Sequence, residues 1–139
     1  MSAPHIRRVL ETALYVTDMA RAVAFYRDVL GLRPMGGNDR LTPIDAGEGT
    51  VLLLFRQGAS VEGIDYPGGR IPPHDGAGPV HIAFAIEASA FDPWQARLAE
   101  HGVEVEVVNR WDRGGQSAYF RDPDGHSIEL ATPGVWPTY

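Results

Sequence analysis

The sequence contains no cysteine, no long apolar run and no cluster of basic residues, and each absence excludes a class of protein. Zero cysteines exclude disulfides and thiolate metal sites, and they make the cytoplasm the expected location. No apolar run approaches the roughly 20 residues needed to span a bilayer, and no signal peptide is recognisable, so we expect no membrane partner. A formal charge of −6 without an Arg or Lys cluster disfavours nucleic-acid binding.

What remains is an ordinary globular composition, with 44% hydrophobic and 22% charged residues. A chain of 139 residues is long enough for one domain with a real core, or for two small halves that share one. The acidic balance is compatible with a metal ion or a cationic ligand, although it mainly favours solubility.

The most informative stretch is YFRDPDGHSIELATPG, residues 119–134, which predicts a strand, a tight turn and a second strand. In the turn Asp122-Pro123-Asp124-Gly125, proline presets φ for the first corner and glycine accepts a positive φ. Alternation after the turn places Glu129 on one face, between small residues, while aliphatic side chains point to the other face. A lone carboxylate in such a strand is typical of a cavity wall.

The chain contains an internal repeat of a strand, a helix and three strands, which predicts an α+β fold. Glu11 opens the first copy and His81 opens the second at the same phase, and Glu129 in the last strand corresponds to about Leu53 in the first copy. The predicted elements of the first copy are strands 9–16, 34–40, 41–46 and 50–55 and a helix over 19–30; those of the second are strands 80–86 and 103–108, a helix from Asp92-Pro93 to His101, and the two strands around the turn.

Between the copies, the segment 57–79 is rich in glycine and proline and has neither helical nor strand periodicity. We therefore expect a long loop there. Loops of this length are uncommon in compact domains unless they have a function, and a lid over a site is one such function.

Three motifs together resemble the vicinal oxygen chelate superfamily, which includes glyoxalase I, extradiol dioxygenases, fosfomycin-resistance transferases and bleomycin-resistance proteins. They are ETALYVTDMARAVAFYRDVLGL (11–32), HIAFAI (81–86) and YFRDPDGHSIEL (119–130). The resemblance implies two βαβββ modules whose mixed sheets curl around a shared cavity. It predicts a single glyoxalase-like domain over 1–139, with module one at about 8–56, the loop 57–79 and module two at about 80–132. It also implies a homodimer, sometimes with modules exchanged between chains.

Carried over position by position, the resemblance implies that a divalent metal is held by Glu11, His81 and Glu129. Many members have histidine where this chain has Glu11, so the metal is open among Fe, Mn, Ni, Mg and Zn. Leu53 stands where glyoxalase I has a glutamate, which argues against a four-ligand site of that type. Two carboxylates and one imidazole leave positions for water and substrate, as a catalytic metal requires.

Each candidate residue also has a purely structural interpretation. Glu11 is equally compatible with an ion pair to Arg7 or Arg8, His81 with a core histidine, and Glu129 with a bond to Arg121; their matched positions together favour the metal. Two further residues are candidates for catalysis beside Glu129. His74 is placed to act as a general acid or base, or simply lies in solvent, and Tyr119 is placed to donate a hydrogen bond to substrate, or is only partly buried with its hydroxyl in water.

The leading hypothesis is a metal-dependent enzyme, a lyase, isomerase or dioxygenase, that acts on a small substrate chelated through vicinal oxygens. The alternative is a metal-free protein that sequesters a ligand, as bleomycin-resistance proteins do. A metallo-thioltransferase acting on fosfomycin is disfavoured, because no set of Lys or Arg residues has the pattern expected for a phosphonate.

Overall fold

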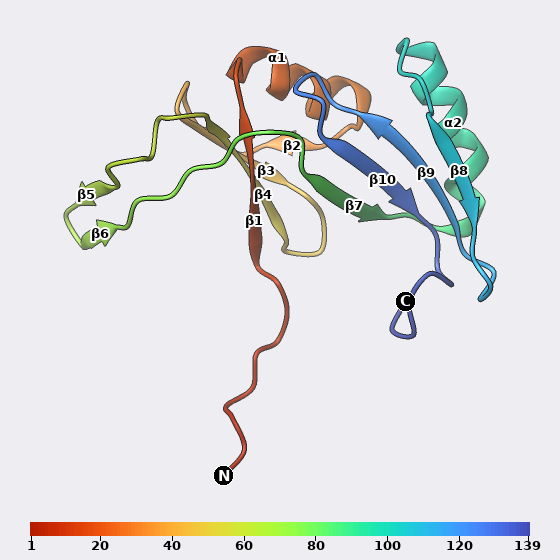
Figure 1. Cartoon of the computed structure of the whole chain (residues 1–139), viewed down its shortest axis with the longest axis horizontal. Helices are drawn as coiled ribbons and strands as arrows, with labels where there is room; N and C mark the ends of the chain where they lie inside the picture. Colours follow the sequence, from red (N-terminus) through yellow and green to blue (C-terminus); the bar gives the residue numbers. More distant parts are fainter. The chain divides into compact units, whose positions relative to one another are not determined.

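The computed structural model describes residues 1–139, which divide into two compact units, Met1–Ala77 and Gly78–Tyr139. Each unit contains a strand, a helix and three further strands in this order, so the predicted α+β fold with two βαβββ modules is confirmed (Figure 1). That the two modules form a single domain stays a prediction. None of the helices has both the length and the apolar character that crossing a lipid bilayer requires.

The elements of the first unit are β1 (Glu11–Val16), α1 (Met19–Ala24), the π-helical turn η1 (Phe25–Val29), β2 (Arg33–Pro34), β3 (Leu41–Asp45), β4 (Val51–Arg56), β5 (Ile64–Tyr66) and β6 (Gly69–Ile71). The elements of the second unit are β7 (His81–Ala85), the 3-10 turn η2 (Ala88–Ala90), α2 (Phe91–Glu100), β8 (Val107–Arg110), β9 (Gln116–Arg121) and β10 (Ser127–Ala131). The predicted strands 34–40 and 103–108 are the least accurate, because β2 is only two residues long and β8 begins at Val107.

The first unit is a four-stranded mixed sheet in the order β1-β4-β3-β2, with its helix packed on it. The helix starts where the Asp18 side chain accepts a hydrogen bond from the backbone N–H of Arg21 at 3.1 Å, as expected for an N-cap. It buries Met19 and Ala22, and the chain leaves it at Gly31, whose φ of +71° is the left-handed conformation that glycine favours.

The second unit repeats this arrangement, with a four-stranded sheet in the order β7-β10-β9-β8. The central strand β10 runs parallel to β7 and antiparallel to β9. Glu129 lies opposite Ala83, the third residue of β7, just as Leu53 lies opposite Ala13, the third residue of β1. The register therefore confirms that Leu53 is the counterpart of Glu129.

The segment 57–79 is not entirely without regular structure, which corrects the prediction of a plain loop. β5 and β6 form a two-stranded antiparallel hairpin, in which Ile64 pairs with Ile71 and Tyr66 with Gly69. The hairpin has only three residues in each strand, so the period-2 pattern that identifies strands from sequence has too few repeats to be recognised. The glycines and prolines lie in the turns and connections around it.

Candidate functional site

The candidate site is on the central strand of the second unit, where Glu129 faces one side of the sheet. Because β10 lies between β7 and β9, its neighbours on that face come from both sides. Tyr119 is directly opposite Glu129 on β9, and His81 is opposite Ser127 on β7, one diagonal step away. The tight turn that precedes β10 fixes this register: an oxygen of the Asp122 carboxylate accepts the backbone N–H groups of Asp124 and His126 at 3.0 and 2.9 Å.

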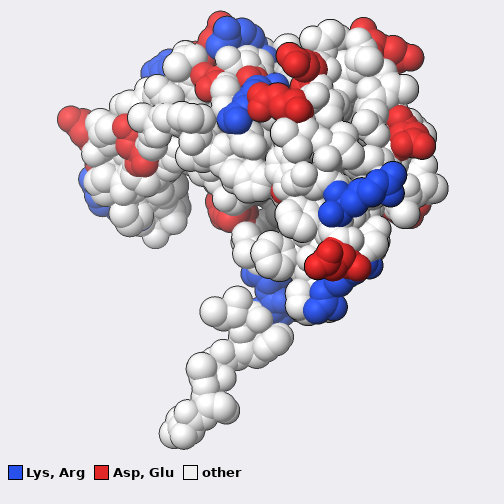
Figure 2. Space-filling model, turned by 45° about the vertical axis from the view of Figure 1, so that its right-hand side comes forward, with Lys and Arg blue, Asp and Glu red and all other residues white.

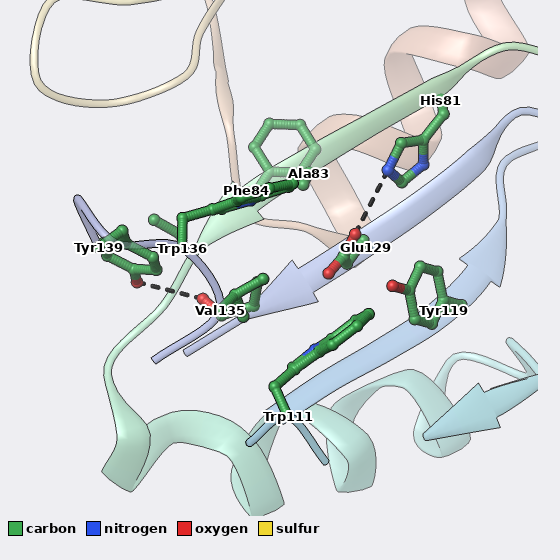
Figure 3. A pocket seen from close by; sticks show the side chains of 11 residues that line it. His81, Ala83, Phe84, Trp111, Tyr119, Glu129, Val135, Trp136 and Tyr139 are labelled. Carbon is green, nitrogen blue, oxygen red and sulfur yellow. Dashed lines mark hydrogen bonds and ion pairs between the residues drawn. The ribbon is translucent and has the colours of Figure 1, made fainter. Parts of the chain in front are cut away.

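The side chains of His81 and Glu129 face each other from the neighbouring strands β7 and β10, with 3.3 Å between His81 Nε2 and Glu129 Oε1 (Figure 3). The other ring nitrogen, Nδ1, is 2.9 Å from the backbone carbonyl oxygen of Ser127. A carbonyl oxygen only accepts hydrogen bonds, so this contact assigns the ring proton to Nδ1 and leaves a lone pair on Nε2 in the neutral imidazole. A lone pair and a carboxylate oxygen repel each other unless a proton or a metal ion lies between them.

The distance between these two atoms is compatible with two ligands on one metal ion. Zinc, for example, binds imidazole nitrogen and carboxylate oxygen at about 2.0–2.2 Å, so two such ligands at right angles are about 3.0 Å apart, and slightly more at wider angles. The observed 3.3 Å falls in this range. The Nδ1 contact with a carbonyl is also the usual second bond of a metal-ligating histidine, because it fixes the tautomer and the orientation of the ring.

A metal ion needs a further protein ligand, which the second unit alone does not supply. Within either unit, no three His, Asp or Glu side chains are grouped closely enough to hold a metal ion. Glu11 lies in the first unit, where it opens β1 as His81 opens β7. Its side chain is exposed and forms no ion pair, while Arg8 donates to Thr50 instead, at 3.3 Å. Glu11 as the third ligand stays a prediction.

Two residues that the sequence analysis did not connect with Glu129 hold its other oxygen. The hydroxyl of Ser117 donates to Glu129 Oε2 at 2.5 Å, and the indole N–H of Trp111 donates to Ser117 Oγ at 2.9 Å. Strand alternation along 116–121 places Ser117 on the same face as Tyr119, so a signal for it existed. The indole contact had no such signal, because Trp111 follows β8 in the β8–β9 turn.

Tyr119 lies where the sequence analysis placed it, beside Glu129. Its ring is nearly parallel to the ring of His81, with 6.2 Å between the ring centroids. Burial, and then the negative charge of Glu129, raise the pKa of Tyr119, so its hydroxyl keeps its proton at neutral pH. A protonated phenol in this position can donate a hydrogen bond to an oxygen of a bound substrate.

The pocket next to this group has a volume of about 530 Å³ and opens on one side of the sheet. Its polar groups are His81, Glu129 and Tyr119, and no arginine lines it. The remaining lining residues are apolar or aromatic: Ala83, Phe84, Ala85, Trp111, Ala131, Val135, Trp136 and Tyr139 (Figure 3). Elsewhere, on the face that Figure 2 shows, acidic and basic side chains alternate with uncharged areas.

The chain after β10 supplies one wall of the pocket, which the sequence analysis did not anticipate because it ended the second module at about residue 132. The hydroxyl of Tyr139 lies 2.9 Å from the carbonyl oxygen of Ile86 and 3.1 Å from that of Ala131. These contacts hold the segment against the sheet, and Trp136 borders the pocket with two thirds of its surface exposed.

His74 lies in the first unit, where it is neither free in solvent nor part of a group of three His, Asp or Glu side chains that could hold a metal ion. Its Nδ1 is 2.7 Å from the hydroxyl of Tyr15, and its ring meets the edge of Phe55 with 4.4 Å between centroids. These contacts attach the segment 57–79 to β1 and β4 of its own unit. The predicted role of His74 in catalysis stays a prediction.

Comparison with known proteins agrees with the resemblance seen in the motifs. Residues 8–130 match the sequence profile of the Glyoxalase/Bleomycin resistance protein/Dioxygenase superfamily. The metallothiol transferase FosB of Shouchella clausii is 34% identical over 119 residues, covering 84% of this chain and 74% of the relative. The glutathione transferase FosA of Serratia marcescens is 29% identical over 117 residues, with the same coverage. Among solved structures, a lactoylglutathione lyase from Agrobacterium tumefaciens has a TM-score of 0.84 at 35% identity, covering 94% of this chain and 96% of the other.

Proposed function

Because the chain belongs to the Glyoxalase/Bleomycin resistance protein/Dioxygenase superfamily, we propose that it is a divalent-metal-dependent enzyme that binds a small substrate through two adjacent oxygen atoms. The observation that carries the proposal is the facing pair on β7 and β10, where His81 Nε2 and Glu129 Oε1 lie 3.3 Å apart while His81 Nδ1 contacts a backbone carbonyl oxygen. The similarity to a metallothiol transferase and to a lactoylglutathione lyase supports an enzyme of this kind.

In the proposed site, His81, Glu129 and Glu11 would hold the metal, one of Fe, Mn, Ni, Mg or Zn. Its chemistry would be to polarise the substrate oxygens and to stabilise negative charge that develops on them. Tyr119 donates a hydrogen bond to a substrate oxygen, since its raised pKa keeps the phenol protonated. His74 is the proposed general acid or base, although its contact with Tyr15 must then open to release it.

The lining of the pocket indicates the chemistry of the substrate. Apart from His81, Glu129 and Tyr119, the walls in the second unit are apolar or aromatic, and none carries a positive charge. Such walls suit a substrate whose two oxygens are attached to an apolar body, because burying an unpaired anion there is costly. We therefore favour a lyase, isomerase or dioxygenase reaction over transfer of a thiol to an anionic substrate. Thiol transfer is the second candidate reaction, because the chain is similar to the glutathione transferase FosA and to the metallothiol transferase FosB.

Two further expectations belong to this proposal. The chain acts as a homodimer, as the resemblance implies, and it works in the cytoplasm, as a sequence without cysteine suggests. Size-exclusion chromatography with light scattering tests the first, and fractionation of the source cells tests the second.

Metal analysis of the full chain after mild purification tests the central claim. About one divalent ion per site is expected for the unchanged protein, with little or none for Glu129→Ala or His81→Ala. Glu104→Ala is the matched control, since Glu104 is an exposed carboxylate of the same unit. An unchanged protein that binds none of Fe²⁺, Mn²⁺, Ni²⁺, Mg²⁺ and Zn²⁺ contradicts the proposal.

The alternative of a metal-free ligand-sequestering protein makes the opposite prediction. Its support is the open pocket with Trp111, Trp136 and Tyr139 around it, which could hold a bulky ligand by stacking. If the apoprotein binds an aromatic ligand tightly, and a Glu11/Glu129 double variant binds it equally well, sequestration is the better account. Loss of binding in the double variant favours the enzyme.

A further inference from the structure

One oxygen of the Glu129 carboxylate is held by two consecutive hydrogen bonds that end on the wall of the pocket. The indole N–H of Trp111 donates to Ser117 Oγ, and the hydroxyl of Ser117 donates to Glu129 Oε2. We call Trp111, Ser117 and Glu129 the relay. All three residues belong to the second unit and join the β8–β9 turn to the central strand.

The direction of these hydrogen bonds follows from the number of protons available. A serine hydroxyl has a single proton, and an ionised carboxylate can only accept, so the Ser117 proton points to Glu129. The oxygen of Ser117 must then receive its second bond from a donor, and an indole nitrogen can do nothing but donate. Ser117 is fully buried, so water cannot replace either partner.

The relay leaves the other carboxylate oxygen pointing toward His81. With Oε2 bound by Ser117, Oε1 is the oxygen that lies 3.3 Å from His81 Nε2. Groups bound to a metal ligand orient it and tune its affinity, so their loss weakens metal binding even though they never touch the metal.

We propose that Ser117 and Trp111 are positioning residues for the metal-binding carboxylate of Glu129, which makes one wall of the substrate pocket part of the metal site. The inference rests on the proposed function, since it assumes that Glu129 is a ligand. Trp111 then has two roles: its ring borders the pocket, and its N–H fixes Ser117. A substrate that packs on the indole thereby contacts the same hydrogen-bonded unit that holds the metal.

Titrations of the full chain with Mn²⁺ measure how much each of the two residues contributes to metal affinity. Ser117→Ala removes the bond to Glu129 and should weaken Mn²⁺ binding by about 10-fold to 100-fold, the range known for lost partners of metal ligands. Trp111→Phe keeps the ring but not the donor, and it should weaken binding by about 3-fold to 10-fold because Ser117 remains.

Two matched controls separate this effect from general damage. Ser60 is as buried as Ser117 but lies in the first unit, where its hydroxyl receives a bond from Arg40 at 3.1 Å. Trp94 is a half-buried tryptophan of α2 and makes no contact with the pocket. Ser60→Ala and Trp94→Phe should keep the Mn²⁺ affinity within about twofold of the unchanged protein, the scatter expected for substitutions away from the site.

A spectroscopic measurement reports on the arrangement of the metal ligands rather than on the stability of the fold. The visible absorption of the Co²⁺-loaded protein depends on the arrangement of its ligands, so Ser117→Ala and Trp111→Phe should change band position or intensity while both controls reproduce the original spectrum. If both relay variants keep the original affinity and spectrum while the unchanged protein binds metal, the relay is refuted and the proposed function stands. If the unchanged protein binds no divalent ion, both are refuted. Should Ser117→Ala fail to fold, Trp111→Phe alone decides.

Discussion

Replacing Glu129 by glutamine separates metal binding from folding more sharply than any other substitution in this protein. The amide has nearly the same shape as the carboxylate but no charge. The amide oxygen can accept a hydrogen bond from Ser117 as the carboxylate does. The amide NH₂ group would replace Glu129 Oε1, which lies 3.3 Å from His81 Nε2, and can donate to that nitrogen when the imidazole is neutral. Glu129→Gln therefore converts a facing pair of acceptors into a normal donor and acceptor.

The structure predicts opposite effects on stability and on metal affinity. A new neutral hydrogen bond contributes about 0.5–1.5 kcal/mol, and the exposure of about half of the His81 side chain places the gain near the lower end. For a chain of this size the metal-free protein should melt about 1–4 °C higher. Metal binding should weaken by more than about 100-fold, or about 2.7 kcal/mol, since loss of a direct charged ligand exceeds loss of its supporting partner.

Differential scanning calorimetry in the presence of a chelator gives the melting temperature of the metal-free protein. Isothermal titration calorimetry with Mn²⁺ or Zn²⁺ gives the metal affinity. Glu104→Gln, at an exposed position of the same unit, is the control and should change neither. The reasoning is refuted if Glu129→Gln binds metal within about threefold of the unchanged protein, or if the metal-free variant loses more than about 2 kcal/mol of stability.

Three further substitutions test the framework of the two units. Asp122→Ala leaves two backbone N–H groups of the turn before β10 without their acceptor, and urea unfolding should show a loss of about 2–4 kcal/mol. Gly115→Ala places a methyl group 2.5 Å from the backbone of Gly134, so the pocket wall after β10 should exchange amide hydrogens faster while the β10 amides stay protected. Burial, and then a nearby carboxylate, raise the pKa of Tyr15, so its stabilising contribution is complete below its ordinary value near 10 and is lost as pH rises through the folded value. Tyr15→Phe should remove that alkaline loss, measured as the urea midpoint against pH, and should also speed proteolysis of the segment that holds His74.

The sequence was sufficient for the repeated topology because the signals were local and strong. Alternation and the Asp-Pro-Asp-Gly turn placed Glu129 on a cavity-facing strand, and the common phase of Glu11 and His81 defined the two copies. The correspondence of Leu53 to Glu129 was predictable because the last strands of the two copies occupy matching positions in the repeat. Elements with few residues were not predictable: the hairpin within 57–79 has too few repeats for any periodicity to appear.

The partners of the Glu129 carboxylate were only partly predictable for a different reason. A hydrogen bond such as the one from Trp111 to Ser117 depends on the path of a turn and on the rotamer of one side chain, which leave no period in the sequence. The same is true of the wall that Trp136 and Tyr139 form, because their segment has neither helical nor strand pattern. Strand faces can be predicted from alternation, whereas the contacts that turns make across a face require coordinates.

The position of β10 in the middle of its sheet determines when the site can form during synthesis. On the ribosome, β7 and the β8–β9 pair emerge first, and neither can join the sheet until residues 127–131 follow, 46 positions after His81. Pairing over such a separation is slow, and before it occurs β7 and β9 expose unpaired edges that favour aggregation. His81 and Glu129 therefore come together only when the second sheet closes. If they bind a metal as proposed, metal uptake follows folding of that unit rather than guiding it.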